Sequence, residues 1–306
     1  MSFPVRSVVT GDLGELAIEL AQRLLEQGDD VILLGETLPP EAEQRAAVVR
    51  HHRFTFVRTA LRERTEALAE LAGIDRVFLV SGARRLPVSA EGALERLDGV
   101  VRRTINVLDG CLEAGATLVV VTPSGADIPE DPRSYRSGTA LQRFAASSVR
   151  RYHEKYGLAV ATVTLPELSA CTGVGCLGTL LPLFVQRALR HEDILLPGHA
   201  TQPVCFSCLH DVVPVIVAVA ERGEAAATPY LITEEQTSVI ALAQRVVAYT
   251  GSRSTIVFGG EGADTVVTSI ERRPDVDEFL PRTAVDAFIQ ATLFDIRVKP
   301  LLHRSA

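Results

Sequence analysis

Lysine and tryptophan are the residues that this sequence most lacks. Its 306 residues include no tryptophan and only two lysines, Lys155 and Lys299, against 29 arginines. The chain therefore offers almost no candidate for a catalytic lysine. The basic residues are scattered and the net charge is -7, which excludes the clustered positive surface that nucleic acids and anionic membranes require. Uninterrupted apolar runs of the roughly 20 residues that span a bilayer are absent too.

Cysteine is also scarce, and its odd number, 5, suits a reducing compartment better than a disulfide scaffold. The C-x4-C spacing of Cys171 and Cys176 and the C-x2-C spacing of Cys205 and Cys208 are ones that zinc sites use. However, residues 205–208 have the pattern of a buried strand, in which cysteine packs as a small apolar residue, so we expect no metal. The chain starts with a strand and a Gly turn rather than a signal peptide, and we expect a cytoplasmic protein.

The first 165 residues alternate short β-branched runs with amphipathic helical stretches, a pattern typical of a parallel sheet covered by helices. Strands are predicted at residues 5–10, 30–34, 54–58, 76–80, 118–122 and 160–165. The plainest of the predicted helices are residues 15–27, 104–114 and 139–156. The sequence therefore predicts an α/β protein with a doubly wound parallel sheet, Rossmann-like, in the strand order 3-2-1-4-5-6.

After Pro166 the periodicity loosens into a loop, a helix near residues 180–190 and short elements up to the end of the chain. We expect two parts: a nucleotide-binding core over residues 1–165 and a smaller C-terminal substrate lobe over residues 166–306, from which segments can return to the core. The length of the chain suits these two parts and needs no third domain.

A Gly-rich turn, TGDLGELA over residues 10–17, follows the first predicted strand and opens the first predicted helix. In this context backbone amides approach a pyrophosphate. The candidate cofactor-binding residues of the turn are Gly11, Leu13, Gly14 and Leu16. Asp12 and Glu15 weaken this prediction, because they put carboxylates where a dianionic pyrophosphate would lie.

Further landmarks follow in order along most of the chain. They are Thr104–Leu108, Leu118–Ser124, Tyr156–Leu158, Phe206–Val212, and Arg272–Asp275 followed by Pro281–Thr283. Together with the Gly-rich turn, they resemble the extended short-chain dehydrogenases, the NAD-dependent epimerase/dehydratase family. The last two landmarks are similar to the tail of sugar-nucleotide dehydratases and decarboxylases.

The resemblance implies a Ser or Thr after the fifth strand, a Tyr that exchanges a proton with the substrate, and a Lys four residues on that lowers the tyrosine pKa. Ser124 matches the first of these, but Gly138 holds the tyrosine position and Gln142 the lysine position. Tyr135, one helical turn earlier, is a candidate for a relocated acid, although Thr139 rather than a lysine follows it four residues on. We therefore expect a degenerate active site.

The positions that the resemblance assigns to cofactor and substrate contacts also differ from the family pattern. Gly35 ends the second strand where an acid would bind the adenosine ribose, although the neighbouring Glu36 can take that role and is a candidate cofactor-binding residue. Ala60 replaces an adenine-contacting Asp, and Val204 replaces an arginine that grips the diphosphate of a sugar nucleotide. We expect NAD(P) to bind weakly or not at all.

Other acid or base candidates lie after the sixth strand. Glu167 comes directly after that strand, at the edge where such folds bind ligands, and its alternative role is that of a solvated loop acid. His210 opens a helix beside Asp211, which we expect to be the N-cap of that helix, and His199 is a third candidate.

Three functions are consistent with these residues. The chain is expected to be a non-redox enzyme, catalysing a cyclisation, elimination or isomerisation of a small molecule; the alternatives are an NAD(P)-dependent oxidoreductase or epimerase with substitute acid/base residues, and a non-catalytic partner protein. The Arg-rich composition indicates a GC-rich bacterial gene and favours specialised metabolism. We also expect a homodimer, since residues 101–114 and 139–156 match the helices that pair family members, and the second carries an apolar stripe.

Overall fold

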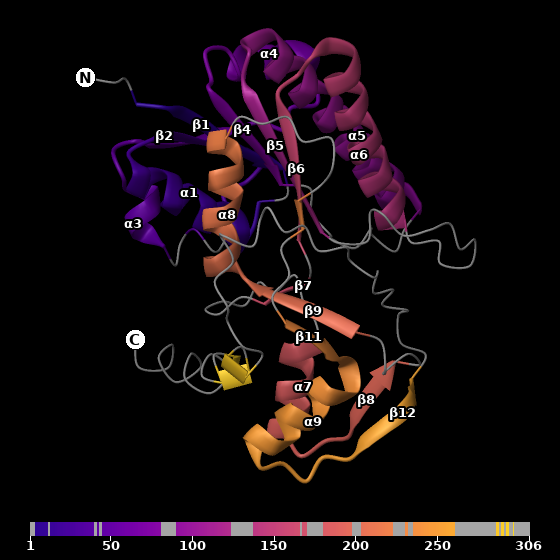
Figure 1. Cartoon of the computed structure of the whole chain (residues 1–306). Coiled ribbons are helices and arrows are strands. Elements are labelled where there is room, and N and C mark those ends of the chain that lie inside the picture. Colours follow the sequence, from indigo (N-terminus) through magenta and orange to yellow (C-terminus); the bar gives the residue numbers. More distant parts are fainter. Residues whose placement is uncertain are drawn as a thin grey trace. The chain divides into compact units, whose positions relative to one another are not determined.

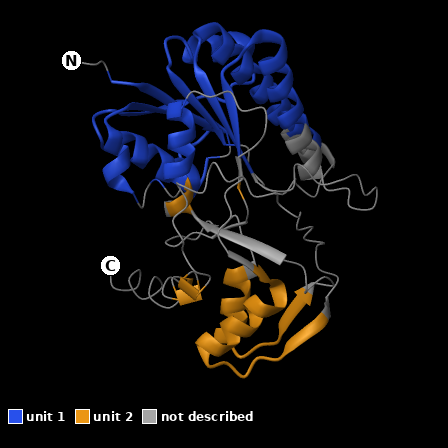
Figure 2. Ribbon diagram, in the orientation of Figure 1, with its two compact units in different colours: residues 1–164, 213–231 blue, residues 165–212, 232–306 orange. Residues whose placement is uncertain are grey.

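The computed structural model describes two compact units. Its described residues are 4–11, 13–39, 42, 45–80, 90–123, 137–165, 167–169, 180–197, 203–222, 230–231, 235–260, 286–287, 289–290, 292–293 and 296. Unit 1 comprises residues 1–164 and 213–231, and unit 2 comprises residues 165–212 and 232–306 (Figure 2).

A seven-stranded sheet forms the centre of unit 1 (Figure 1), in the order β10-β6-β5-β4-β1-β2-β3. Its strands are β1 (Arg6–Gly11), β2 (Asp30–Gly35), β3 (Phe54–Arg58), β4 (Arg76–Val80), β5 (Thr117–Pro123), β6 (Val160–Leu165) and β10 (Tyr230–Leu231). The predicted parallel sheet and its order 3-2-1-4-5-6 are confirmed. The short strand β10 extends the sheet beyond β6, to which it is parallel.

The inner strands of the sheet have continuously apolar sequences because both of their faces are buried. Val8 and Val9 of β1, and Val77 and Phe78 of β4, are all fully buried, although successive side chains of a strand point to opposite faces. A parallel sheet that helices cover on both faces imposes this pattern.

Helices α4 (Arg64–Glu70), α5 (Ala90–Ala114) and α6 (Ser137–Tyr156) pack against one face of the sheet. A polar network joins them: Tyr152 donates to Asp109 Oδ1 at 2.7 Å, and Arg64 donates to Asp109 Oδ2 at 2.7 Å. Burial, together with the hydrogen bond to Asp109, raises the pKa of Tyr152 to about 12, so its hydroxyl stays a donor at neutral pH.

Helices α1 (Glu15–Gln27) and α3 (Ala46–Val49) belong to the other side of the sheet, and α1 contacts β1 and β2 (Figure 1). The apolar stripe predicted for α1 is buried, and Gly28 ends the helix in the left-handed conformation, with φ of 92°. Helix α8 (Leu209–Arg222) begins two residues before Asp211, which therefore lies in the first helical turn rather than at the N-cap.

Unit 2 has a separate core around Phe184, Ile194, Leu242 and Val246. Its elements are α7 (Leu180–Leu189), α9 (Val239–Thr250), the sheet β11-β9-β7, and the parallel pair β12-β8. The strands are β7 (Glu167–Ser169), β8 (Ile194–Pro197), β9 (Pro203–Cys208), β11 (Glu235–Ser238) and β12 (Ile256–Gly260). None of the helices among the described residues of either unit is long and apolar enough to cross a membrane.

Candidate functional site

The carboxyl ends of β1 to β4 hold most of the polar and Gly-rich features of unit 1. The sheet order reverses between β1 and β4, and the crevice outside the carboxyl ends of the strands at such a point is where open α/β sheets bind ligands.

The first glycine of the turn is required by packing. Gly11 has φ of 112°, and a Cβ atom there would lie 2.1 Å from the carbonyl oxygen of Val80 in β4. Only glycine allows this positive φ together with so close an approach of two strands. Gly11 therefore fixes the direction in which the chain leaves β1.

The second glycine faces open space. Gly14 is the N-cap of α1, makes no side-chain cap bond, and has no atom within 4 Å of the place where a Cβ would stand. Leu16, another predicted cofactor-binding residue, has a buried side chain, so only its backbone can face a ligand. The N-terminus of α1 at Gly14 thus leaves the space that a bound anion needs.

The charge of the turn opposes that role. Glu15 lies in the first turn of α1 and is only 6% exposed. A carboxylate is favourable at a helix N-terminus, and a second anion beside it would meet repulsion. Asp12 lies outside the described residues.

The end of β2 carries an apolar side chain instead of an acid. A Cβ atom on Gly35 would lie 2.3 Å from Leu13 Cδ1 and 3.3 Å from Leu13 Cγ. The side chain of Leu13 therefore lies over Gly35, in the space that any larger residue at the end of β2 would use. This contact joins two positions that are 22 residues apart.

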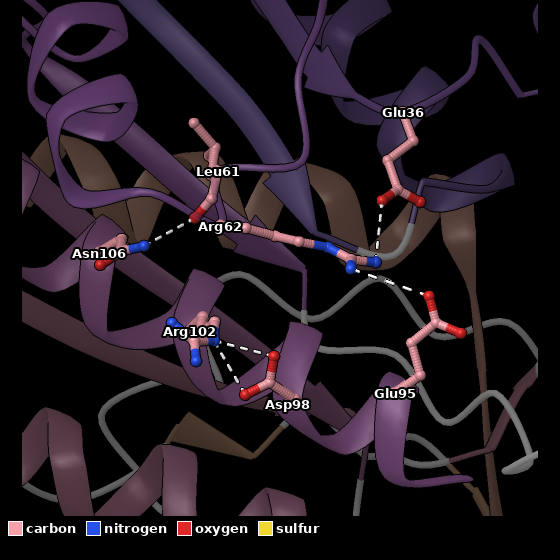
Figure 3. A network of polar contacts seen from close by, with 7 residues as sticks. All are labelled: Glu36, Leu61, Arg62, Glu95, Asp98, Arg102 and Asn106. Carbon is pink, nitrogen blue, oxygen red and sulfur yellow. Dashed lines mark hydrogen bonds and ion pairs between the residues drawn. The ribbon is translucent and has the colours of Figure 1, made fainter. Parts of the chain in front are cut away.

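Beyond Gly35, Glu36 forms an ion pair with Arg62, which follows β3 (Figure 3). The distance from Arg62 Nη2 to Glu36 Oε1 is 3.3 Å, and Arg62 Nη1 lies 3.9 Å from Glu95 Oε1 of α5. The guanidinium group also lies 3.7–3.8 Å from the place where a Cβ of Gly99 would stand. Arg62 thus bridges the end of β2 and α5 through two exposed ion pairs, one of them with Glu36.

The backbone before Arg62 is held in an uncommon conformation. Leu61 has φ of 53°, in the left-handed region, which costs a non-glycine residue about 1–2 kcal/mol. Its N–H donates to Thr59 Oγ1 at 3.0 Å, and its carbonyl accepts from Asn106 Nδ2 at 2.9 Å. Both backbone groups of this buried residue are therefore satisfied by side chains, which aim the chain toward Arg62.

Thr122, near the end of β5, has a buried hydroxyl that makes no hydrogen bond within the part of the chain that the structure describes. It stands two residues before Ser124, and a buried polar group without a partner needs an explanation, such as a bound water or ligand. Thr122, Arg62 and the role of Asn106 could not be predicted from the sequence. What lies next to each of these side chains is decided only when the chain folds.

The predicted catalytic residues are only partly described. Ser124 and Tyr135 lie outside the described residues. Glu167 begins β7 and pairs with Phe206 in the backbone, and His210 lies in the first turn of α8, but the side chains of both lie outside the described part. Gly138 and Gln142 lie in α6, one helical turn apart.

The two cysteine pairs with zinc-like spacing are only partly described. Among the described residues of both units, no group of three or more His, Cys, Asp or Glu side chains is placed to hold an ion. Cys171 and Cys176 lie outside these residues, and Cys205 and Cys208 belong to β9.

Comparison with known proteins identifies the family. The model of the NAD dependent epimerase/dehydratase family matches residues 7–233, and the chain belongs to this family, as its sequence landmarks predicted. A UDP-N-acetyl-alpha-D-glucosaminuronate decarboxylase from Bacillus cytotoxicus is 21% identical over 267 residues, covering 82% of each protein.

Solved structures share the fold. The dTDP-glucose 4,6-dehydratase DesIV from Streptomyces venezuelae, solved with NAD bound, has a TM-score of 0.77 and 20% identity over 97% of this chain and 98% of its own. The enzyme WbmF from Bordetella bronchiseptica, solved with NAD+ and UDP, has a TM-score of 0.74 and 18% identity over 98% of this chain and 95% of its own.

The described residues suit the pyrophosphate of the NAD that the family binds better than they suit its adenosine ribose. The open space at Gly14 suits a pyrophosphate, but Gly35 offers no acceptor for the adenosine ribose and Leu13 covers it. Glu36, the remaining acid, is paired with Arg62. Among the described residues, the end of β2 therefore offers an adenosine ribose no acid other than Glu36.

Proposed function

We propose that this protein is a non-redox enzyme that cyclises, isomerises or eliminates a group from a small molecule. One observation supports the proposal: Gly138 and Gln142, to which the resemblance assigns the tyrosine–lysine pair of the family, both lie in α6. Glycine has no side chain, and the amide of glutamine does not titrate, so neither residue can accept or donate a proton in the way the family does.

The substrate of this proposed enzyme is a small molecule that does not need a diphosphate clamp. The curated relative acts on a UDP-sugar, but the arginine expected to bind such a diphosphate is Val204 here, which lies in β9 opposite Thr237. Valine cannot bond a phosphate. We place the reaction in bacterial specialised metabolism, because the composition is Arg-rich, and in the cytoplasm, because the odd number of cysteines suits a reducing compartment.

A second candidate function is an NAD(P)-dependent oxidoreductase or epimerase with substitute acid/base residues. The open first turn of α1 at Gly14 favours it. The two candidates differ in the mass of the product, since isomerisation or cyclisation keeps the mass of the substrate, elimination lowers it by the group lost, and dehydrogenation removes two hydrogens. Mass spectrometry of the products formed from a metabolite panel without added dinucleotide would support the first candidate, whereas turnover that requires NAD(P) would overturn it. A third function, a non-catalytic partner protein, predicts no turnover of any substrate.

The residues of the proposed reaction can be tested on the substrate that such a panel identifies. Replacing Ser124 by Ala should cost about 1–3 kcal/mol of transition-state stabilisation, because one hydrogen bond to the substrate is lost. Tyr135→Phe is the matched test of a relocated acid. Restoring the family pair with Gly138→Tyr and Gln142→Lys should leave the native rate no higher. Full activity in both single variants, or a faster NAD-dependent reaction in the restored pair, would contradict this account.

We also propose that the protein forms a twofold dimer through α5 and α6. Tyr156, at the end of α6, is 49% exposed and Phe144 is half-buried, whereas Ala145 is buried within the chain and cannot belong to an exposed stripe. Light scattering should give twice the mass of the 33.0 kDa chain at micromolar concentration, and Phe144→Glu should shift the mass toward the monomer. A monomeric mass of the unaltered protein would refute the dimer.

A further inference from the structure

Two side chains from different parts of the chain, Leu13 and Arg62, lie at the end of β2 beside the Gly-rich turn. In the nucleotide-binding folds of this kind, an acid at the end of β2 accepts hydrogen bonds from the ribose hydroxyls of NAD. Here the end of β2 is Gly35, and the space above it is taken by Leu13, whose Cδ1 would be 2.3 Å from any Cβ at that position. A ligand that reaches this position would have to displace the leucine side chain.

The second side chain is Arg62, which forms an ion pair with Glu36, the acid next to Gly35. Glu36 Oε1 accepts from Arg62 Nη2 at 3.3 Å, and the other end of the guanidinium faces Glu95 (Figure 3). Arg62 is itself directed by the left-handed Leu61, whose carbonyl is bonded to Asn106. The charge of Glu36 is therefore paired with that of Arg62 in an exposed ion pair.

We infer that Leu13 and Arg62 exclude the adenosine half of a dinucleotide from this site and so decide which ligands it accepts, namely compact ligands that carry no adenosine ribose. This inference rests on the proposed function, because a non-redox enzyme has no need of a hydride carrier. It assigns a specificity role to two residues that are outside the catalytic set.

The distances define a way to reopen the site. Leu13→Ala removes both leucine atoms that crowd Gly35, and the nearest remaining atom to a new Cβ is then Thr37 O at 3.7 Å, an ordinary contact. Gly35→Asp then adds the missing acceptor. Neither single variant should raise the affinity for NAD as much as the double variant. Leu13→Ala gains space without an acceptor, and Gly35→Asp gains an acceptor that the leucine covers.

Calorimetric titration with NAD and NADP tests the inference on the full chain. The double variant should bind NAD about 10- to 100-fold more tightly than the unaltered protein, since hydrogen bonds to a charged group are worth that much. This gain should exceed the product of the two single gains. It should favour NAD over NADP, because the new carboxylate repels a 2′-phosphate.

Arginine variants provide the matched control. Arg62→Gln should release Glu36 and add to the NAD affinity of the double variant. Arg102→Gln removes an arginine from the neighbouring pair, in which Arg102 Nε donates to both oxygens of Asp98 at 2.8 Å, and should leave the affinity unchanged. Thermal unfolding of every variant checks that the fold is retained.

The outcomes separate the two proposals. Submicromolar binding of NAD or NADP by the unaltered protein would overturn both the exclusion and the cofactor-independent function. Absence of binding in the unaltered protein, with no gain or only a multiplicative gain in the double variant, would overturn the role of Leu13 and leave the proposed reaction class standing. An equal effect of Arg62→Gln and Arg102→Gln on NAD affinity would show that Arg62 does not contribute to the exclusion.

Discussion

Replacing Gly11 by alanine should destabilise the protein by about 3 kcal/mol or more. The added Cβ would lie 2.1 Å from the carbonyl oxygen of Val80, a backbone atom that the pairing of β4 with β1 and β5 holds in place. The φ of 112° at this position adds a conformational cost for any residue with a side chain. Urea unfolding should show a lower midpoint with an unchanged slope.

Gly14→Ala is the control for this substitution. Gly14 belongs to the same turn, but it has an extended backbone with φ of -153° and no atom within 4 Å of the added Cβ. We expect a loss of about 1 kcal/mol or less, since alanine is only a poorer N-cap than glycine. Similar losses at the two glycines would show that the approach of Gly11 to Val80 is not what the turn requires.

Replacing Asn106 by alanine should cost about 1–3 kcal/mol, because the buried carbonyl of Leu61 loses its donor. The substitution also removes one of the two bonds that hold Leu61 in the left-handed region. Amide hydrogen exchange at residues 59–62 should therefore become faster than in the unaltered protein, in addition to the loss of global stability.

Thr104→Ala is the comparison for this second prediction. Thr104 is buried in the same helix, but its hydroxyl donates to the carbonyl of Val100 within α5, one helical turn earlier. Its loss should cost about 1 kcal/mol or less and should leave exchange at residues 59–62 unchanged. If the two substitutions have the same effect, Asn106 contributes only to its own helix and does not position Arg62.

The strands of unit 1 were predictable because their signal is local. The strands predicted at residues 54–58, 76–80 and 160–165 have the observed bounds, and the others differ by one residue at one or both ends. Helix α5 was harder: the apolar pattern indicated a start near Thr104, whereas the helix begins at Ala90. Gly92 and Gly99 disfavour a helix locally, and tertiary packing along the sheet outweighs their propensity.

The sequence by itself determined the fold class, the strand order and the family, because these depend on periodicities and on motifs within a few residues of one another. It also gave the two residues that the resemblance assigns to the tyrosine–lysine pair, Gly138 and Gln142, since a residue's identity needs no coordinates. Only the tertiary structure decided that Leu13 covers Gly35 and that Arg62 engages Glu36. Such contacts join positions 22 and 26 residues apart through the ends of neighbouring strands, and no local pattern encodes which side chains meet there.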